Sequence, residues 1–316
     1  MNRYVFNVDE EQAGERLDVL LAVLYPEKSR SSIKKLIENG MVNMLGPDGE
    51  EILSKQLKPS YQVKEDDRIL LEIPPDEFPE AVPEDIPLDI LYEDDDLIVV
   101  NKPKGMVVHP APGHSSGTLV NAVLFHCGGS LSGIGGVLRP GIVHRIDRDT
   151  TGSVIICKND RSHAGIAAQL ADHSLGREYH ALVIGRMPSE DGTVDAPIAR
   201  SKTDRKKMAV CAAGSGKRAV THYHVLRYFP DDNISYISCR LETGRTHQIR
   251  VHMSHIHHPV LNDEVYGGVI RTRFKLPQGQ CLHAKTLDFI HPVSGETVST
   301  DAPLPEYFSH LLEVLR

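Results

Sequence analysis

The sequence lacks the residues and runs on which several protein classes depend. It holds five cysteines in 316 residues, and no two of them form a CxxC pair, so neither a zinc ribbon nor a disulfide framework is predicted. No apolar run approaches the roughly 18 residues that a membrane span needs. The first residues, MNRYVFNVDEEQ, are acidic and contain no apolar signal core. We therefore expect a cytoplasmic protein, with buried thiols and no membrane association.

One segment lacks positive charge altogether. Residues 71–100 hold 11 acidic and no basic side chains, whereas residues 101–316 hold 25 basic and 19 acidic ones. The net charge of −8 therefore does not exclude a polyanionic partner for the rest of the chain. The acidic segment also carries five prolines, and both features favour an extended connection. We predict a small domain at residues 1–74, a linker at 75–92 and a large domain at 93–316.

The N-terminal segment has the pattern of a small α+β module. Apolar residues repeat at helical spacing from Leu17 to Leu24, and SRSSIKKLIENG has a serine cap and a closing glycine. RILLEI, residues 68–73, is typical of a strand. The basic residues around the second helix are Lys28, Arg30, Lys34 and Lys35. They are consistent with phosphate contact, although a solvated helix face is the commoner explanation for such a run.

The large domain mixes strands and helices without regular alternation. Segments rich in β-branched and aromatic residues predict strands at 97–102, 153–158, 177–185, 219–229, 233–242 and 281–289. Helical periodicity appears at 118–125, 162–173, 246–256 and 306–316. Because a doubly wound sheet requires strands and helices to alternate, we predict an α+β fold with a large mixed, mainly antiparallel sheet.

Three incomplete motifs exclude other chemistry. GSGKR lacks the Ser or Thr that completes a phosphate-binding loop, and HRIDRDTTG has an isoleucine inside what would be the H-R-D of a protein kinase, with no DFG after it. His255, His257 and His258 do not have the spacing of metal ligands, so surface histidines are the favoured interpretation. No metal site is predicted.

The stretch GIVHRIDRDTTGSVIICK places charge between two apolar runs. By itself Asp147 is best explained as a turn former, followed by good turn residues. A second charged loop, LETGRTHQIRVHMSHIHHPVLNDEVYG, lies about a hundred residues further along the chain. Two polar, strand-flanked loops can form one cleft. An arginine facing Asp147 would stabilise the carboxylate, and Tyr179 in REYHALVIG could stack on a base.

In these blocks the sequence resembles the RluA-type pseudouridine synthases along nearly the whole chain. VVNKPKGMVVHP resembles the first block of the family, HRIDRDTTG its active-site loop, REYHALVIG its K-x-Y segment, TGRTHQIRVH with NDEVYG its arginine block, and LHAKTLDFIHP its last block. Residues 15–74, within the predicted small domain, resemble an S4 RNA-binding domain. Ile146 and Thr151 are conservative departures from the usual Leu and Ser. The S4-like part departs more, because its turn after the basic helix is longer than usual.

The resemblance implies a role for each matching residue. Asp147 matches the catalytic aspartate, Arg250 the arginine that pairs with it, and Tyr179 the stacking tyrosine. Residues expected to shape the loop or contact RNA are His144, Arg145, Thr150, Arg245, His247 and Gln248; a structural, hydrogen-bonded histidine is an equal alternative for His144. A basic patch expected to track an RNA backbone contains Arg205, Lys206 and Lys207.

The resemblance also implies the activity. It predicts a monomeric enzyme that isomerises uridine to pseudouridine without a cofactor, in 23S-type ribosomal RNA or a precursor of the large subunit. Two alternatives stay open: a pseudouridine synthase acting on transfer RNA, and a non-catalytic RNA-binding protein of ribosome assembly.

Overall fold

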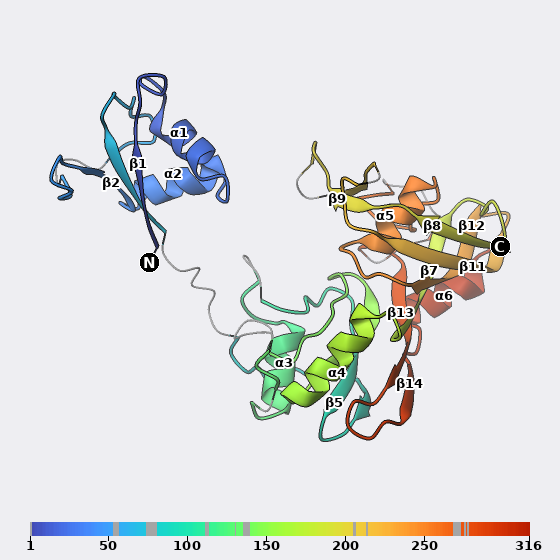
Figure 1. Cartoon of the computed structure of the whole chain (residues 1–316). Helices are drawn as coiled ribbons and strands as arrows, with labels where there is room; N and C mark the ends of the chain where they lie inside the picture. Colours follow the sequence, from blue (N-terminus) through green and yellow to red (C-terminus); the bar gives the residue numbers. More distant parts are fainter. Residues whose placement is uncertain are drawn as a thin grey trace. The chain divides into compact units, whose positions relative to one another are not determined.

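The computed structural model describes residues 2–52, 57–73, 81–110, 114–129, 131–134, 140–204, 207–212, 214–267, 273–274, 276 and 278–316. The chain divides into two compact units between residues 78 and 79 (Figure 1). Among the described residues, no helix is long and apolar enough to cross a membrane.

The N-terminal unit is a three-stranded antiparallel sheet packed against two helices. Its elements are β1 (Asn2–Asn7), α1 (Leu17–Leu24), α2 (Arg30–Glu38), β2 (Val42–Leu45) and β3 (Arg68–Ile73), with strand order β1-β3-β2. Both predicted helices and the predicted third strand are confirmed. The helices form because Ser29 caps α2 through the amide of Ser32, and because the apolar faces of α1 and α2 pack on the buried residues of β3.

The C-terminal unit is built on a nine-stranded sheet. Its strands are β4 (Ile90–Glu93), β5 (Leu97–Lys102), β6 (Thr151–Cys157), β7 (Gly176–Ile184), β8 (Asp191–Asp195), β11 (Val220–Phe229), β12 (Ile234–Leu241), β13 (Leu282–Ile290) and β14 (Thr297–Asp301). A separate hairpin pairs β9 (Ile198–Arg200) with β10 (Met208–Val210). The helices are α3 (Leu119–His126), α4 (Asp160–Ala171), α5 (Gln248–His255) and α6 (Glu306–Val314).

The sheet has the order β4-β5-β6-β13-β7-β12-β11-β8, with β14 beside β13. Among the described strands, only β6 and β13 pair in parallel, so the prediction of a mixed, mainly antiparallel sheet is confirmed. Strand β4 begins at Ile90, inside the segment predicted as linker, because its residues pair with β5.

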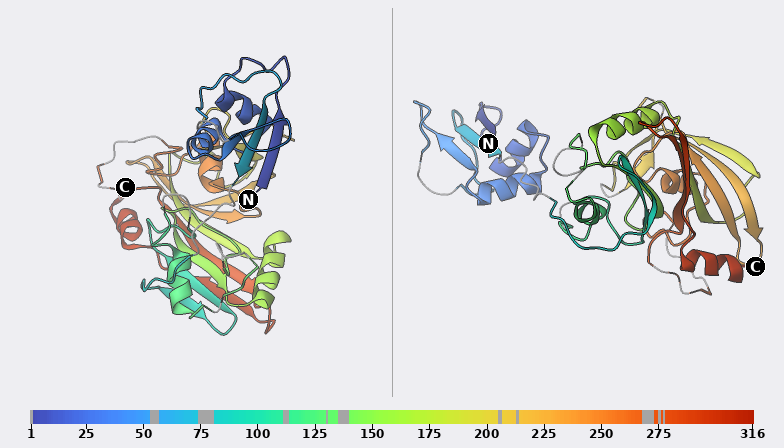
Figure 2. Two further views of the ribbon diagram at one scale, coloured as in Figure 1. Left: turned by 90° about the vertical axis from the view of Figure 1, so that its left-hand side faces the viewer. Right: turned by 90° about the horizontal axis from the view of Figure 1, so that it is seen from below.

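Apolar side chains cover both faces of the large sheet. Ile98 and Val100 of β5 join a core with α3 and α5, whereas Leu97 and Val99 join a second core with α4. Alternate residues of a strand point to opposite faces, so α3 and α4 lie on opposite sides of the sheet (Figure 2). Strand β6 is buried at every position, which fixes the end of the charged loop that precedes it.

A close backbone approach fixes the parallel pairing. Gly152 has a φ of +106°, and a Cβ built on it would lie 2.1 Å from the carbonyl oxygen of Ala284 in β13. Only glycine combines this conformation with this contact. The start of β6, directly after the charged loop, therefore depends on one residue without a side chain.

We predict that Gly152→Ala destabilises the protein by about 3 kcal/mol or more, because the methyl group must push β13 away from β6. The control is Gly295→Ala, where φ is +77° but no atom lies within 4 Å of the added Cβ. That variant should lose only about 1–2 kcal/mol through its left-handed backbone. Urea unfolding measures both. Equal losses in the two variants would contradict the steric explanation.

Candidate active site

The two charged loops predicted to form one cleft line a single cavity of about 360 Å³. Its walls come from the loop before β6, from β7 and from the segment that leads into α5. Asp147, Tyr179 and Arg250 all line it. Asp147 precedes β6, Tyr179 lies on β7, and Arg250 lies on α5, which follows β12. The strand order β6-β13-β7-β12 therefore brings together residues that are more than a hundred positions apart in the sequence.

A buried arginine joins two carboxylates at the floor of this cavity. Arg250 donates from Nη1 to Oδ2 of Asp147 at 2.8 Å, and from Nε and Nη2 to Asp263 at 2.6 and 2.9 Å. Burial opposes the charge of Arg250, but the hydrogen bonds and charges of Asp263 and Asp147 raise its pKa above the ordinary value. The guanidinium thereby fixes the direction of the Asp147 carboxylate. Oδ1 of Asp147 forms no hydrogen bond with the described residues.

The backbone before α5 adopts a strained conformation. His247 has a left-handed φ of +57°, although it is not a glycine. This turn places its Nε2 3.8 Å from Oδ1 of Asp147, while Nδ1 bonds to the hydroxyl of Tyr266 at 2.8 Å. Burial lowers the pKa of His247, although Asp147 opposes this shift. Tyr266 also lies under the guanidinium of Arg250, 5.1 Å from its ring centre.

The loop that carries Asp147 is braced from outside the cavity. Lys102, fully buried on β5, donates to the carbonyls of Pro103, Met106 and Arg148 at 2.8 to 2.9 Å. Burial lowers the pKa of Lys102 to about 7. The three carbonyl acceptors match the three N–H groups of the ammonium form of Lys102. Thr150 accepts a hydrogen bond from the side chain of Gln280 at 2.9 Å.

Strand β7 supplies one wall of the cavity. Tyr179 is 8 % exposed, and burial raises the pKa of its hydroxyl. Arg177 lies two residues earlier and therefore on the same face of the strand. His144 accepts a hydrogen bond from the amide of Ile155 at 3.0 Å, and burial together with the charge of Arg177 lowers its pKa to about 3. His144 is thus a neutral structural histidine that holds the loop against β6.

The remaining loop residues divide into buried and accessible ones. Gln248 is buried and bonds to Thr243, to the amide of Arg245 and to two groups of β11, so its side chain holds the second loop together. Arg245 donates to the carbonyl of Arg218 and lines the cavity. Arg145 is exposed, with one nitrogen 3.5 Å from His109, and also lines the cavity.

The basic residues predicted to bind RNA have different environments. Arg205 and Lys206 lie outside the described residues, and Lys207 is half-buried beside β10. In the N-terminal unit, Lys34 and Lys35 are exposed on α2, and Lys28 is half-buried just before it. Arg30 forms an ion pair with the buried Asp18 at 2.8 Å, so it also joins α2 to α1.

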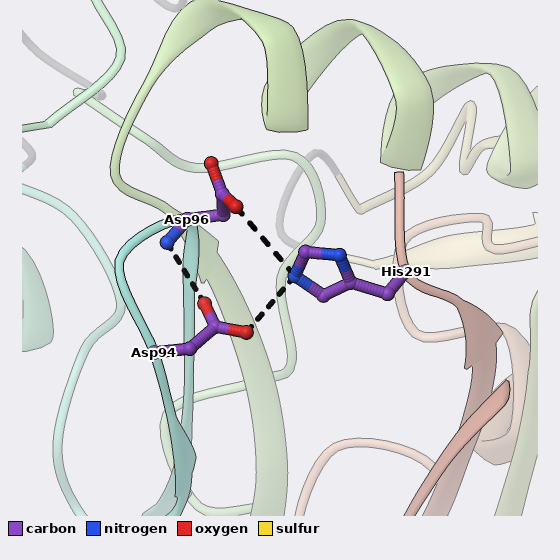
Figure 3. A group of neighbouring side chains, drawn as sticks. All are labelled: Asp94, Asp96 and His291. Atoms are coloured by element: carbon purple, nitrogen blue, oxygen red, sulfur yellow. Dashed lines mark hydrogen bonds and ion pairs between the residues drawn. The ribbon is translucent and has the colours of Figure 1, made fainter. Parts of the chain in front are cut away.

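A cluster away from the cavity has the composition of a metal site. Asp94, Asp96 and His291 offer three oxygen and nitrogen atoms within 4.8 Å of one another (Figure 3). His291 accepts the amides of Val293 and Ser294 at Nδ1, so its hydrogen is on Nε2, 2.9 Å from Asp94. A protonated nitrogen has no lone pair for a metal. The cluster therefore brings the β4–β5 turn and the end of β13 together, through the close approach of His291 to Asp94 and Asp96.

Sequence reasoning missed three residues at this site. Asp263 lies in the block NDEVYG, but nothing in its neighbourhood indicates that it binds Arg250. Lys102 and Arg177 look like surface residues, because burial of a long cationic side chain leaves no local sequence signal. Two signals could have placed Arg177 in the cavity: its position two residues before Tyr179 on a strand, and the resemblance of REYHALVIG to the K-x-Y segment of the family.

Comparisons with known proteins agree with this geometry. The family described as RNA pseudouridylate synthase matches residues 96–255. The chain is 50% identical over 311 residues to "Ribosomal large subunit pseudouridine synthase D" of Zymomonas mobilis, covering 97% of this chain and 95% of that protein. It is 46% identical to "Uncharacterized RNA pseudouridine synthase YlyB" of Bacillus subtilis, covering 100% and 99%.

A solved structure shares the fold. "Human RNA Pseudouridylate Synthase Domain Containing 1" superposes with a TM-score of 0.53 over 73% of this chain and 95% of that chain, at 24% identity. The likeness supports the fold of the C-terminal unit.

We predict that Asp263→Asn lowers the free energy of unfolding by about 3 kcal/mol or more, since it removes one charge from a buried ion pair. Asp232→Asn is the matched control, because Asp232 pairs with the half-exposed Arg273 at 2.7 Å and such a pair contributes at most about 1 kcal/mol. Urea unfolding of both variants at pH 7 tests this. A loss at Asp263 no larger than that at Asp232 would show that the buried pair is not stabilising.

Stability should fall as pH is lowered from about 6.5 to about 4. Burial lowers the pKa of His283 to about 4 and that of His144 to about 3, whereas both take up protons near pH 6.5 in the unfolded chain. Each histidine lowers the free energy of unfolding by up to about 1.4 kcal/mol for each unit by which the pH falls in this range. Urea unfolding between pH 4.5 and 7 should therefore show that the free energy of unfolding of His283→Gln depends less steeply on pH than that of the wild-type protein. The exposed His310→Gln should keep the original slope; equal slopes in all three proteins would exclude His283 as a source.

Proposed function

Because the chain belongs to the RNA pseudouridylate synthase family, we propose that it converts uridine to pseudouridine in large-subunit ribosomal RNA. The observation that carries the proposal is the Asp147 carboxylate, held by Arg250 in a cavity with Tyr179. The names of the relatives from Zymomonas mobilis and Pseudomonas aeruginosa, both "Ribosomal large subunit pseudouridine synthase D", support large-subunit RNA as the substrate.

The proposed reaction moves a base within one nucleoside. The bond between C1′ and N1 breaks, the uracil turns, a bond forms between C1′ and C5, and the proton on C5 moves to N1. Substrate and product contain the same atoms, so the balance requires no oxidant or reductant. The route needs a carboxylate near the sugar carbon, as glycosidases place one beside an electron-poor sugar. We propose Asp147 as the catalytic residue. Three routes are open to it: attack on C1′, removal of a sugar proton, and attack on the base.

Two other residues have proposed roles beside the carboxylate. Arg250 aligns Asp147 and leaves Oδ1 directed to the substrate. Tyr179 provides a ring on which the uracil stacks after it has left the RNA helix. Leaving the stack costs on the order of a few kcal/mol, and stacking on an aromatic side chain offsets part of it.

Binding of the surrounding RNA is assigned to accessible cations. Arg145 and Arg245 line the cavity and are proposed to contact the flipped nucleotide. We assign Lys34 and Lys35, exposed on α2, to RNA contacts of an S4-like N-terminal domain. The patch around Lys207 is proposed to follow the backbone further away. The enzyme is proposed to act as a cytoplasmic monomer.

We predict that Asp147→Asn reduces pseudouridine formation at least about a thousand-fold, while the urea midpoint stays within the range of surface variants. Pseudouridines are counted in large-subunit RNA after incubation of unmodified ribosomal RNA with each protein. Asp191→Asn is the control, because Asp191 is exposed on β8. Full activity of Asp147→Asn would refute the mechanism.

A second experiment separates the substrates. Mapping pseudouridines in a strain that lacks the protein should show missing sites in large-subunit RNA. Missing sites in transfer RNA alone would assign the enzyme to transfer RNA. A wild-type protein that binds ribosomal RNA but forms no pseudouridine would leave the non-catalytic assembly role.

A further inference from the structure

Arg177 is a buried cation without a buried anion. Its side chain lies on β7 with 8 % of the residue exposed, and it lines the same cavity as Asp147 and Tyr179. Nε is buried with no hydrogen-bond partner, and Nη2 reaches only the carbonyl of Glu242, at 3.5 Å. No described carboxylate pairs with it.

The neighbouring acids are occupied elsewhere. The carboxylate of Glu242 binds Arg218 at 2.8 Å and His222 at 2.9 Å. Glu178 lies on the opposite face of β7, where His180 is 3.4 Å from its carboxylate. Burial lowers the pKa of Arg177, and the charge of Arg245 adds to this effect, so the folded protein without ligand carries a destabilised positive charge.

The chain also leaves space for this side chain. A Cβ on Gly244 would lie 2.6 Å from Nη1 of Arg177, so any larger residue there would displace the guanidinium. Gly244 is exposed at the cavity and has no positive φ that would itself demand glycine. Glycine at position 244 therefore leaves room for the guanidinium of Arg177 beside the cavity that both residues line.

We propose that Arg177 binds a phosphodiester group next to the target uridine and so positions the nucleotide against Asp147. This inference rests on the proposed function. The uracil and the ribose of a uridine are neutral, so only the flanking phosphates bring an anion into the cavity. A guanidinium is suited to phosphate because it offers several N–H donors in one plane. Arg177 is therefore a positioning residue that completes its ion pair only with RNA.

The test uses RNA in which a neutral linkage replaces a single phosphodiester. RNA fragments that the wild-type protein modifies are synthesised with one methylphosphonate on either side of the target uridine, or at a distant position as a control. Replacing Arg177 with Met should lower kcat/KM about 10- to 100-fold on normal RNA, the range for a hydrogen bond to a charged group. One neutral linkage should cause the same loss in the wild-type protein and no further loss in Arg177→Met. If the neutral linkage lowered kcat/KM by the same factor in the wild-type protein and in Arg177→Met, the two changes would be independent and the proposal would be overturned.

A second measurement separates positioning from structure. Because Arg177 has no buried partner, Arg177→Met should be at least as stable as the wild-type protein in thermal unfolding without RNA. A structural role would lower the midpoint instead, and that result would overturn the proposal. Arg177→Lys keeps the charge and should recover part of the activity on normal RNA.

The control variant is Arg227→Met, the same change at an exposed arginine of β11. It should keep wild-type activity on every fragment. The wild-type protein supplies the distinction from the proposed function: absence of pseudouridine in its reaction would refute that function. If the wild-type protein is active but the neutral linkage also lowers kcat/KM of Arg177→Met, only the phosphate contact is refuted.

Discussion

The site depends on one buried guanidinium shared unequally between two carboxylates. Asp263 is fully buried and accepts two N–H groups of Arg250 and the amides of Val265 and Tyr266. Asp147 receives one N–H and keeps an oxygen toward the cavity. Asp263 is thus closed to any ligand, whereas Asp147 can still meet one through its second oxygen. This arrangement supports the proposed catalytic role of Asp147 and leaves Asp263 to hold the arginine in place.

The two buried arginines of the cavity are in opposite electrostatic situations. Arg250 pairs with two carboxylates, whereas no described carboxylate pairs with Arg177. Tyr179 lies within range of both Arg177 and Asp147, which shift the pKa of its hydroxyl in opposite directions. The cavity thus holds one carboxylate that is already paired and one guanidinium without a described carboxylate partner. An anionic phosphate is complementary to the second of these groups.

Sequence reasoning predicted the elements better than their contacts. The helix at Gln248–His255 and the strands at β6, β7 and β13 follow from local periodicity and β-branched residues, which short-range interactions decide. The partnership of Asp147 with Arg250 came from family resemblance, since 103 positions separate them. The roles of Asp263 and Arg177 were not predicted, although both residues lie in blocks that resemble the family. A buried charge is defined by what surrounds it, and that depends on strands paired far apart along the chain.

The parallel contact between β6 and β13 also has a consequence for biosynthesis. The loop with Asp147 leads into β6, whose first residues pair with His283 and Ala284. These belong to a strand that the ribosome makes more than 130 residues later. Contacts between distant segments form late, after the intervening chain exists. The cavity therefore closes only after β13 has been synthesised, more than a hundred residues after the loop with Asp147.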